Sequence, residues 1–290
     1  MEKAPKGRVF MKYEVLHLKD YYPFLGENGC DPTVEVYLPY NMTEMNRQND
    51  KRPCMIVCPG GGYSMCSQRE AEPIALQFLP QGYNVFTITY SVAPHRFPTQ
   101  LREVAALMEL IYKNADDWNC DVSKIAIIGF SAGGHLAAHY STMFDCKEVR
   151  EVFPESKSVN ASVLCYPVIT ADPAHAHMGS FYNLLGKQDI SPEETEYFSC
   201  EKNVKDTTPP AFIWHTAEDT CVPVMNSLMY AGALSAHKVP FELHIYPFGA
   251  HGSSTCDAQT LDTVDKGLAH AGAWLESLEK WLKLIGFTRS

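Results

Sequence analysis

The sequence predicts an α/β fold in three layers, with about eight strands in one mostly parallel sheet and helices on both of its faces. Six short apolar runs alternate with helix-patterned segments from residue 54 onward. These runs are apolar throughout, which is typical of parallel strands that are covered on both sides. Hydrophobic residues make up 46% of the 290 residues and charged residues 20%, which supplies a large core and excludes a disordered chain.

Two strands are predicted before this alternation begins, at residues 9–18 and 33–39. Both have a mixed or alternating pattern, and the connection between them contains Gly, Asp and Pro, so we expect an antiparallel pair at one edge of the sheet. Polar residues 41–53 then form a surface loop. The buried strands follow at residues 54–58, 84–92, 124–130, 161–167, 211–216 and 241–247.

Helices are predicted between these strands, at about residues 69–80, 100–115, 132–144, 223–236 and 259–284. In the last of them, apolar residues from Leu268 to Ile285 recur mostly every three or four positions, which places one apolar stripe on the sheet. Residues 168–210 are too long for an ordinary loop, so we expect an insert that is functional or partly helical. We expect residues 1–290 to form one domain, with this insert over its site.

Charge and cysteine content exclude several classes of partner. Lysine and arginine total 24 against 34 aspartate and glutamate, and the net charge of −10 argues against binding of nucleic acid. The ten cysteines are scattered without any Cys-x-x-Cys, so we expect free thiols in a reducing cytoplasm. The N-terminal residues lack an apolar signal-peptide core, and no run approaches the roughly 18 apolar residues of a membrane span. We therefore expect a cytoplasmic protein with no membrane partner.

The strongest chemical signal is Gly129-Phe130-Ser131-Ala132-Gly133, which has the pattern G-x-S-x-G. It directly follows one predicted strand and opens the next predicted helix, which is the context in which this pattern forms a nucleophile elbow. The tight turn exposes Ser131 above the sheet, and the free N–H groups of the helix N-terminus favour negative charge there. We predict that Ser131 is a nucleophile; the alternative is a glycine turn with an incidental serine.

A nucleophilic serine needs a base, and in this topology the base follows a downstream strand. Four histidines are late enough in the chain: His237, His244, His251 and His270. His237 ends a helix, while His244 and His270 fall within a strand and a helix, where structural roles are expected. Only His251 lies in a loop at the carboxyl edge of the sheet, between small neighbours that let it reach inward. We predict that His251 is the base.

The acid is expected in the loop after the strand at residues 211–216, beside the histidine loop. Glu218 and Asp219 both occur there. We favour Asp219, because a turn ending in Val-Pro directs its carboxylate toward the histidine, and Glu218 is the alternative. The acid would orient the imidazole and stabilise the imidazolium without taking the proton itself.

Donors for a developing oxyanion are predicted in Pro59-Gly60-Gly61-Gly62-Tyr63, which follows another strand. Three glycines let backbone N–H groups approach a tetrahedral oxygen without obstruction by side chains. Gly61, Gly62 and the N–H of Ala132 are the candidates, and which glycines donate stays open. The alternative of a phosphate cradle lacks the G-x-x-x-x-G-K-[ST] and G-x-G-x-x-G patterns.

Other clusters carry weaker signals. His175 and His177 stand two positions apart without a metal-binding helix or cysteine pair, so we predict no metal site. Tyr63, Phe181 and Tyr182 are candidate substrate contacts, although aromatic residues at strand ends are more often part of a core. Trp214 is expected to be packing.

The segments that carry this chemistry resemble the α/β-hydrolase fold, and within it the acetylxylan-esterase-like group of small bacterial sugar esterases. The resemblance spans about residues 54–252, and its segments are PGGGYSMCSQREAEPIALQF, TYSVAPHRFPTQLRE, WNCDVSKIAIIGFSAGGHLAAH, LCYPVIT, GSFYNLLG, WHTAEDTCVPVMNSL and ELHIYPFGAHG. It implies a triad of Ser131, Asp219 and His251. It also implies oxyanion donors at Gly61, Gly62 and Ala132. Pro59 departs from the related HGGG loop, where a histidine often stands and braces the loop by a hydrogen bond.

The resemblance implies a serine esterase that hydrolyses short-chain acyl esters of carbohydrates, usually acetyl esters, through an acyl-enzyme and without a cofactor. The expected substrate is a small ester such as an acetylated oligosaccharide. The main alternative is a general short-chain carboxylesterase. A serine peptidase would normally carry a large extra domain, a glycosidase would need two opposed carboxylates, and a non-catalytic binding module would be expected to lack a triad member.

Overall fold

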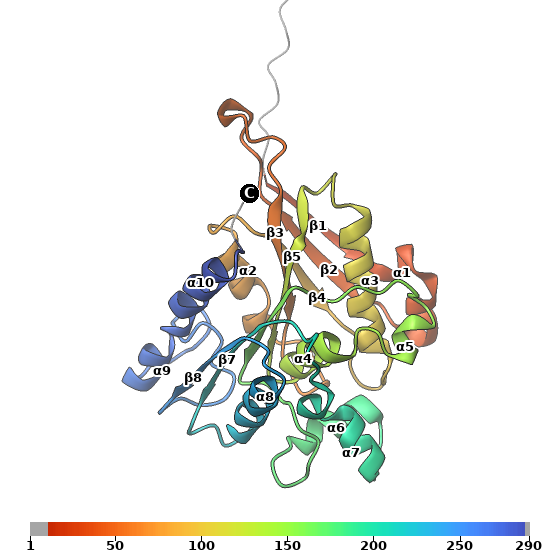
Figure 1. Ribbon diagram of the computed structural model, residues 1–290, viewed down its shortest axis with the longest axis vertical. Coiled ribbons are helices and arrows are strands. Elements are labelled where there is room, and N and C mark those ends of the chain that lie inside the picture. The colour runs from red at the N-terminus through yellow and green to blue at the C-terminus, as the bar shows by residue number, and fades with distance from the viewer. Residues whose placement is uncertain (1–10, 288–290) are drawn as a thin grey trace, which may run out of the picture.

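The computed structural model describes residues 11–287, which fold around one sheet of eight strands (Figure 1). The strands are β1 (Lys12–His17), β2 (Thr33–Leu38), β3 (Arg52–Cys58), β4 (Asn84–Thr89), β5 (Cys120–Phe130), β6 (Ala161–Cys165), β7 (Ala211–Thr216) and β8 (Phe241–Tyr246). Their order in the sheet is β1-β2-β4-β3-β5-β6-β7-β8. β1 pairs antiparallel with β2, and β2 antiparallel with β4, while every other pair is parallel. The predictions of a mostly parallel eight-stranded sheet and of an antiparallel opening pair are confirmed.

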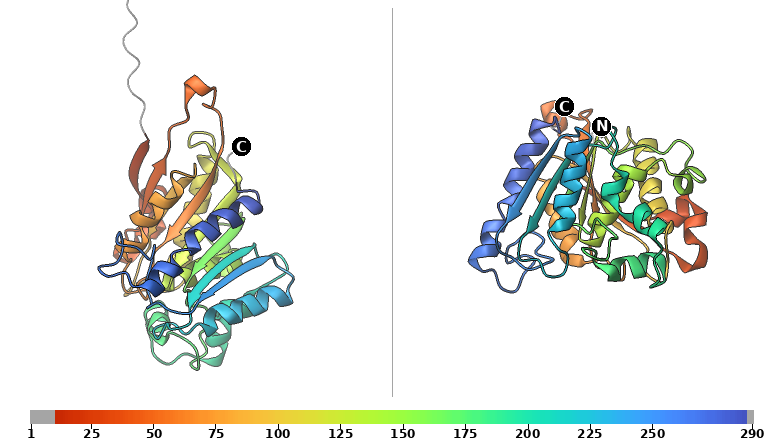
Figure 2. Two further views of the ribbon diagram at one scale, coloured as in Figure 1. Left: turned by 90° about the vertical axis from the view of Figure 1, so that its left-hand side faces the viewer. Right: turned by 60° about the horizontal axis from the view of Figure 1, so that its bottom comes forward.

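Helices cover both faces of this sheet. The longer ones are α2 (Glu72–Phe78), α3 (Thr99–Lys113), α4 (Ala132–Met143), α6 (Met178–Leu185), α7 (Pro192–Phe198), α8 (Met225–Ala236) and α10 (Trp274–Leu284). Buried residues of α3, α4 and α8 form one core cluster, and buried residues of α2 and α10 form another. Figure 2 shows α8 and α10 on opposite sides of the strands. The shorter segments are α1 (Leu18–Tyr21), η1 (Pro23–Gly29), η2 (Thr43–Met45), η3 (Gln68–Glu70), α5 (Lys147–Arg150), η4 (Cys200–Asn203) and α9 (Lys266–Ala271).

Residues 54–58 of the central strand β3 are apolar throughout because both faces of the sheet are covered there. Ile56 belongs to the core cluster on one face, whereas Met55 and Val57 belong to the cluster on the other, and all three side chains are fully buried. Successive side chains of a strand point to opposite faces, so this part of β3 has no solvent-exposed position on either side of the sheet.

The last predicted helix differs from the structure. The long helix predicted at residues 259–284 is wrong in its first part, because α9 begins at Lys266 and a break before Trp274 separates it from α10. Asp257 instead accepts hydrogen bonds from Gln259 N and Thr255 Oγ1, and Asp265 caps α9 by accepting from Leu268 N. Such short polar side chains compete locally with helical hydrogen bonding.

The segment at residues 168–210 is partly helical and contains α6, α7 and η4. At the start of α7, Ser191 accepts from Glu194 N while the Glu194 carboxylate accepts from Ser191 N. This reciprocal capping box fixes the N-terminus of the helix. In the same segment, α6 lies at the carboxyl edge of the sheet, where it contributes to the pocket that is described below.

All ten cysteines are free thiols, and seven of them are buried. Cys54 and Cys58 are fully buried within β3, where a thiol packs as a small hydrophobic group. Between residues 11 and 287, no helix combines the length and the apolar character that a bilayer crossing requires.

Candidate active site

The turn between β5 and α4 holds Ser131 in an unusual backbone conformation, with φ 53° and ψ −119°. A Cβ atom on Gly129 would lie 2.1 Å from the carbonyl oxygen of Gly133, and one on Gly133 would lie 2.2 Å from the carbonyl oxygen of Cys58. Backbone atoms at such distances cannot give way, so the turn needs glycine at both positions. The N–H of Ser131 donates to Cys165 O at 3.0 Å, which ties the turn to β6.

Ser131, His251 and Asp219 form a continuous chain of hydrogen bonds at the carboxyl edge of the sheet. His251 Nε2 lies 2.8 Å from Ser131 Oγ, and His251 Nδ1 lies 2.6 Å from Asp219 Oδ2. The three residues follow β5, β8 and β7, and parallel strands end at the same edge. Glu218 does not reach His251, because its carboxylate accepts from Gly249 N at 3.3 Å.

The other histidines that the sequence offered as bases lie away from Ser131. His244 Nε2 is 2.7 Å from Glu242 Oε1 on β8, and His237 Nδ1 is 2.8 Å from Asp206 Oδ1. His270 is exposed in α9. Within residues 11–287, only His251 hydrogen-bonds to Ser131 Oγ.

Asp219 is held as a carboxylate by four donors. Its Oδ1 accepts from Cys221 N and Val222 N, each at 2.9 Å, and its Oδ2 accepts from His215 as well as His251. Burial by itself raises the pKa of this carboxyl, but the hydrogen bonds from His215, His251 and the backbone, with the charge of His251, hold the pKa well below its usual value.

His215 is a site residue that the sequence did not indicate, because it lies within the apolar strand β7. Its Nε2 is 2.9 Å from Val222 O and 3.2 Å from Asp219 Oδ2, and both of these atoms are acceptors. The Nε2 atom therefore carries a proton, and Nδ1 forms a hydrogen bond with Ser227 Oγ at 2.8 Å. His215 thus gives Asp219 Oδ2 a second histidine contact beside that of His251.

The glycine loop after β3 lies beside Ser131. Gly61 and Gly62 have φ of +127° and +62°, and a Cβ on Gly61 would lie 2.2 Å from Met65 O. Gly60 N already donates to Glu70 Oε2 at 2.9 Å. No acceptor within residues 11–287 takes the N–H of Gly61 or Gly62, so both remain able to bind an oxyanion.

Two side chains brace this loop, although Pro59 stands where a histidine was expected from related loops. The Tyr90 hydroxyl donates to Pro59 O at 2.6 Å, and Asn183 Nδ2 donates to Gly62 O at 2.7 Å. Neither residue was predicted to belong to the site. Asn183 comes from α6, so residues 168–210 contribute directly to the geometry of the glycine loop.

Ser131 and His251 open onto a pocket of about 340 Å³. Most of the other residues that line it are small or polar. The full set is Gly61, Gly62, Ser64, Met65, Ser67, Arg69, Glu70, His177, Gly179, Asn183, Cys221 and Gly252. His177, which the sequence offered only as a weak metal ligand, contacts Ser180 Oγ through Nδ1 at 2.9 Å. No cluster of three or more possible metal ligands occurs within residues 11–287.

The predicted substrate contacts Tyr63, Phe181 and Tyr182 do not line this pocket, and this prediction needs correction. Tyr63 and Phe181 are 1% and 0% exposed, and both pack against the buried His135. The Tyr63 hydroxyl contacts His135 Nδ1 at 2.9 Å, so this side chain ties the end of the glycine loop to α4. Trp214 is fully buried and stacks on Trp274, consistent with a packing role.

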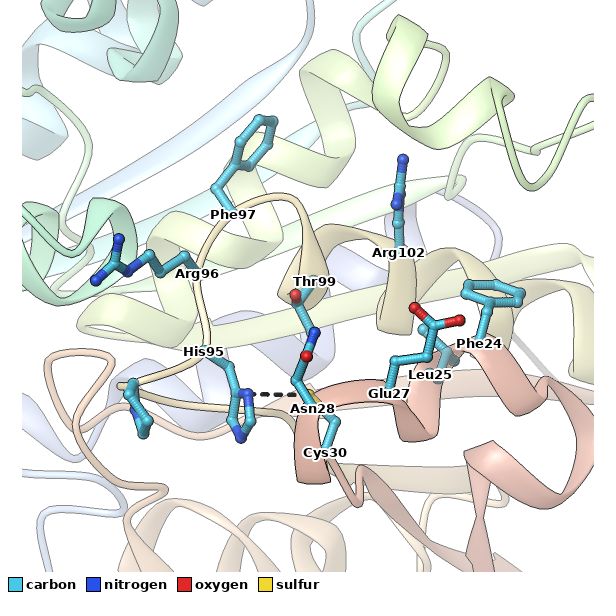
Figure 3. A pocket seen from close by; sticks show the side chains of 11 residues that line it. Phe24, Leu25, Glu27, Asn28, Cys30, His95, Arg96, Phe97, Thr99 and Arg102 are labelled. Carbon is cyan, nitrogen blue, oxygen red and sulfur yellow. Dashed lines mark hydrogen bonds between the residues drawn. The ribbon is translucent and has the colours of Figure 1, made fainter.

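A second cavity of about 390 Å³ lies beside η1 and the start of α3 (Figure 3). It contains a thiol and imidazole in contact, with Cys30 Sγ 3.1 Å from His95 Nδ1. Burial raises the pKa of the Cys30 thiol, and no carboxylate within residues 11–287 orients His95. Figure 3 shows Arg96 and Arg102 directed to different sides, and Arg102 is bound to Glu148 O and Glu151. This cavity therefore lacks an activated nucleophile.

The close contacts at Gly133 lead to a prediction about stability. Gly133→Ala is expected to lower the free energy of unfolding by about 2 to 3 kcal/mol, because the added methyl group meets backbone oxygens of Cys58 and Pro59. Urea denaturation followed by circular dichroism measures this change. Gly232→Ala is the matched control: Gly232 lies in α8 with no atom within 4 Å of an added Cβ, so alanine should leave stability unchanged or raise it by up to about 1 kcal/mol. Equal stability of the Gly133 variant and wild type would contradict the tight turn.

Comparison with known proteins gives relatives of this site and fold. The chain is similar to endo-1,4-beta-xylanase B of Butyrivibrio fibrisolvens, at 40% identity over 74% of this chain and 35% of that protein. It is also similar to an acetylxylan esterase of Xylanibacter ruminicola, at 34% identity over 80% of this chain and 47% of that protein. The chain thus spans less than half the length of either curated relative.

Solved structures resemble the whole described fold. The acetyl ester-xyloside bifunctional hydrolase of Caldicellulosiruptor lactoaceticus has 34% identity and a TM-score of 0.82, over 98% of this chain and 100% of that one. The likeness to such solved structures confirms the predicted α/β-hydrolase fold. The BD-FAE family model matches residues 35–234, which is more than half of the chain and includes Ser131, Asp219 and the glycine loop. This chain belongs to the BD-FAE family of α/β hydrolases.

Proposed function

We propose that this protein is a serine esterase that removes short acyl groups, chiefly acetyl, from carbohydrate esters. The observation that carries the proposal is the hydrogen-bonded chain of Ser131, His251 and Asp219, which opens onto a pocket beside the free N–H groups of Gly61 and Gly62. Nucleophile, base, orienting acid and oxyanion donors are the parts that acyl transfer needs. The relatives named acetylxylan esterase and acetyl ester-xyloside hydrolase support the choice of acetyl esters.

In the proposed reaction, Ser131 Oγ attacks the ester carbonyl carbon while His251 Nε2 takes the hydroxyl proton. The tetrahedral oxyanion accepts from the N–H groups of Gly61, Gly62 and Ala132, and the Asp219 carboxylate stabilises the imidazolium. When the intermediate collapses, His251 returns the proton to the departing alcohol and an acyl-serine remains. Water, deprotonated by His251, then releases the acid and restores the serine.

For the alcohol part of the substrate we propose an acetylated oligosaccharide. The pocket wall offers hydroxyl, amide and guanidinium groups from Ser64, Asn183 and Arg69, which can pair with sugar hydroxyl groups. A general short-chain carboxylesterase is the alternative, and it would not need these three polar groups. The reaction needs no cofactor. We further propose one catalytic domain and a cytoplasmic location, where a reducing environment keeps the ten cysteines as thiols.

Active-site labelling and a substrate panel test this proposal. A fluorophosphonate should label the protein once, and mass spectrometry should place the adduct on Ser131. Acetylated xylo-oligosaccharides should be deacetylated with a higher kcat/KM than p-nitrophenyl acetate or longer p-nitrophenyl acyl esters. Absence of both labelling and hydrolysis would contradict an esterase. Hydrolysis of the p-nitrophenyl esters without deacetylation of the oligosaccharides would instead favour the general carboxylesterase.

A further inference from the structure

Glu70 is a buried carboxylate at the base of the pocket for which the proposed reaction has no role. It ends η3, ten residues after Gly60, and only 3% of its surface is exposed. Its Oε2 accepts from Gly60 N at 2.9 Å, and its Oε1 accepts from the Tyr166 hydroxyl at 2.7 Å. A Cβ on Gly60 would be 2.7 Å from Glu70 Oε2 and 2.9 Å from Ser131 Cβ, so the carboxylate lies close to the nucleophile.

The hydrogen bonds of Glu70 continue to the histidine loop. The Tyr166 hydroxyl accepts from Ser254 N at 2.9 Å, and the Tyr166 ring packs edge-on against His251, with ring centroids 5.0 Å apart. Ser254 stands three residues after His251 in the left-handed region, with φ +48°. Its hydroxyl donates to Arg69 O at 2.6 Å, so the histidine loop is also hydrogen-bonded directly to η3, the segment that contains Glu70. One carboxylate thus joins the glycine loop to the loop that carries the base.

The geometry fits the ionised form of Glu70. Because the Tyr166 oxygen accepts from Ser254 N, its own proton is directed at Glu70 Oε1, and the Gly60 N–H is directed at Oε2. Both carboxylate oxygens therefore act as acceptors, which needs no proton on the acid. Burial raises the pKa of Glu70 above its usual value, and the hydrogen bonds from Tyr166 and Gly60 with the nearby charge of His251 offset only part of this rise.

We propose that Glu70 is a positioning residue of the proposed esterase site. It holds the Gly60 peptide so that the next two N–H groups face the oxyanion, and it holds the His251 loop through Tyr166. Its negative charge also favours the imidazolium of His251 that forms while Ser131 is acylated. This inference rests on the proposed function, because it assigns Glu70 to the same reaction.

Other titratable groups lie near Glu70 and His251. The variants compared below leave all of them unchanged except Tyr166. The groups that interact with Glu70 or with His251 are Arg69, Tyr90, Cys165, Tyr166, His177 and Asp219.

Two variants separate the charge of Glu70 from its hydrogen bonds. Glu70→Gln keeps the size of the side chain but removes its charge. It also places an NH₂ group against one of the two present donors, the Gly60 N–H or the Tyr166 hydroxyl. We expect kcat with p-nitrophenyl acetate to fall about 10- to 100-fold, while KM stays within about threefold. The acid limb of the kcat/KM profile should move to lower pH, because the substitution removes a negative charge close to the general base.

Tyr166→Phe keeps the Glu70 charge and the Gly60 hydrogen bond but breaks the connection to Ser254. We expect kcat to fall about three- to tenfold with the acid limb unchanged. Glu72→Gln is the matched control, because Glu72 is an exposed carboxylate at the start of α2, two residues from Glu70. Its loss should change neither kcat nor the acid limb of the kcat/KM profile. Thermal unfolding of each variant shows which of them are folded.

The outcomes distinguish this inference from the function on which it rests. A wild-type protein without esterase activity or fluorophosphonate labelling overturns both. An active wild type with a folded Glu70→Gln that keeps its kcat within threefold and its acid limb in place overturns the role of Glu70 alone. If Glu70→Gln does not fold, Tyr166→Phe decides, because a kcat within twofold of wild type would show that the connection to the histidine loop has no effect on the reaction.

Discussion

Ser131→Ala is expected to lower kcat for acetyl ester hydrolysis by about 10⁶-fold, which is the largest effect of any single substitution in this protein. Without Oγ no acyl-enzyme forms, and His251 has no hydroxyl proton to take. The residual rate should still exceed that in water by about 10³-fold or more, because the glycine loop and the pocket remain. Single-turnover kinetics and loss of fluorophosphonate labelling measure the effect.

A serine on the same strand provides the control for this substitution. Ser123 lies near the start of β5, far from the carboxyl edge that carries Ser131, and its hydroxyl donates to Asp121 at 2.6 Å. Ser123→Ala should keep the full kcat and the full extent of labelling. Retained hydrolysis in a folded Ser131→Ala protein would show that another residue is the nucleophile.

Asp219→Asn is expected to lower kcat by about 10⁴-fold with little change in KM. Asp219 Oδ2 accepts from both His251 and His215, so an amide NH₂ at this position would face two donors. To relieve this conflict the His251 ring would take the other tautomer, with its proton on Nε2, and could no longer accept the proton of Ser131. Steady-state kinetics with p-nitrophenyl acetate measure the loss.

The same substitution at the neighbouring carboxylate tests which acid is used. Glu218 is exposed and accepts from Gly249 N at 3.3 Å, its only hydrogen bond to the described residues 11–287, so Glu218→Gln should reduce kcat less than about threefold. Because hydrogen bonds hold the pKa of Asp219 well below its usual value, this carboxylate should stay ionised over the working pH range. The acid limb of wild-type activity should therefore not arise from Asp219. A larger loss in the Glu218 variant than in the Asp219 variant would contradict the assignment.

The sequence by itself determined the parts of this protein that are written in local patterns. The parallel sheet is predicted by short apolar runs that alternate with helices. Such runs are apolar throughout because a strand covered on both faces has no exposed position. The Gly129 to Gly133 pattern identified the turn around Ser131, because its close backbone contacts exclude any side chain at the glycines. His251 and Asp219 followed because loops after parallel strands meet at one edge of the sheet.

Only the tertiary structure decided what surrounds these residues. Glu70 and Tyr166 are 96 positions apart, and Tyr166 and Ser254 are 88 apart, so no local spacing indicates that they share hydrogen bonds. Tyr63 and Phe181 were expected at the pocket from residue type alone, but both rings are buried and pack against His135. Residue types and short spacings encode backbone turns and buried faces, whereas the partner of a buried polar group depends on how distant segments pack together.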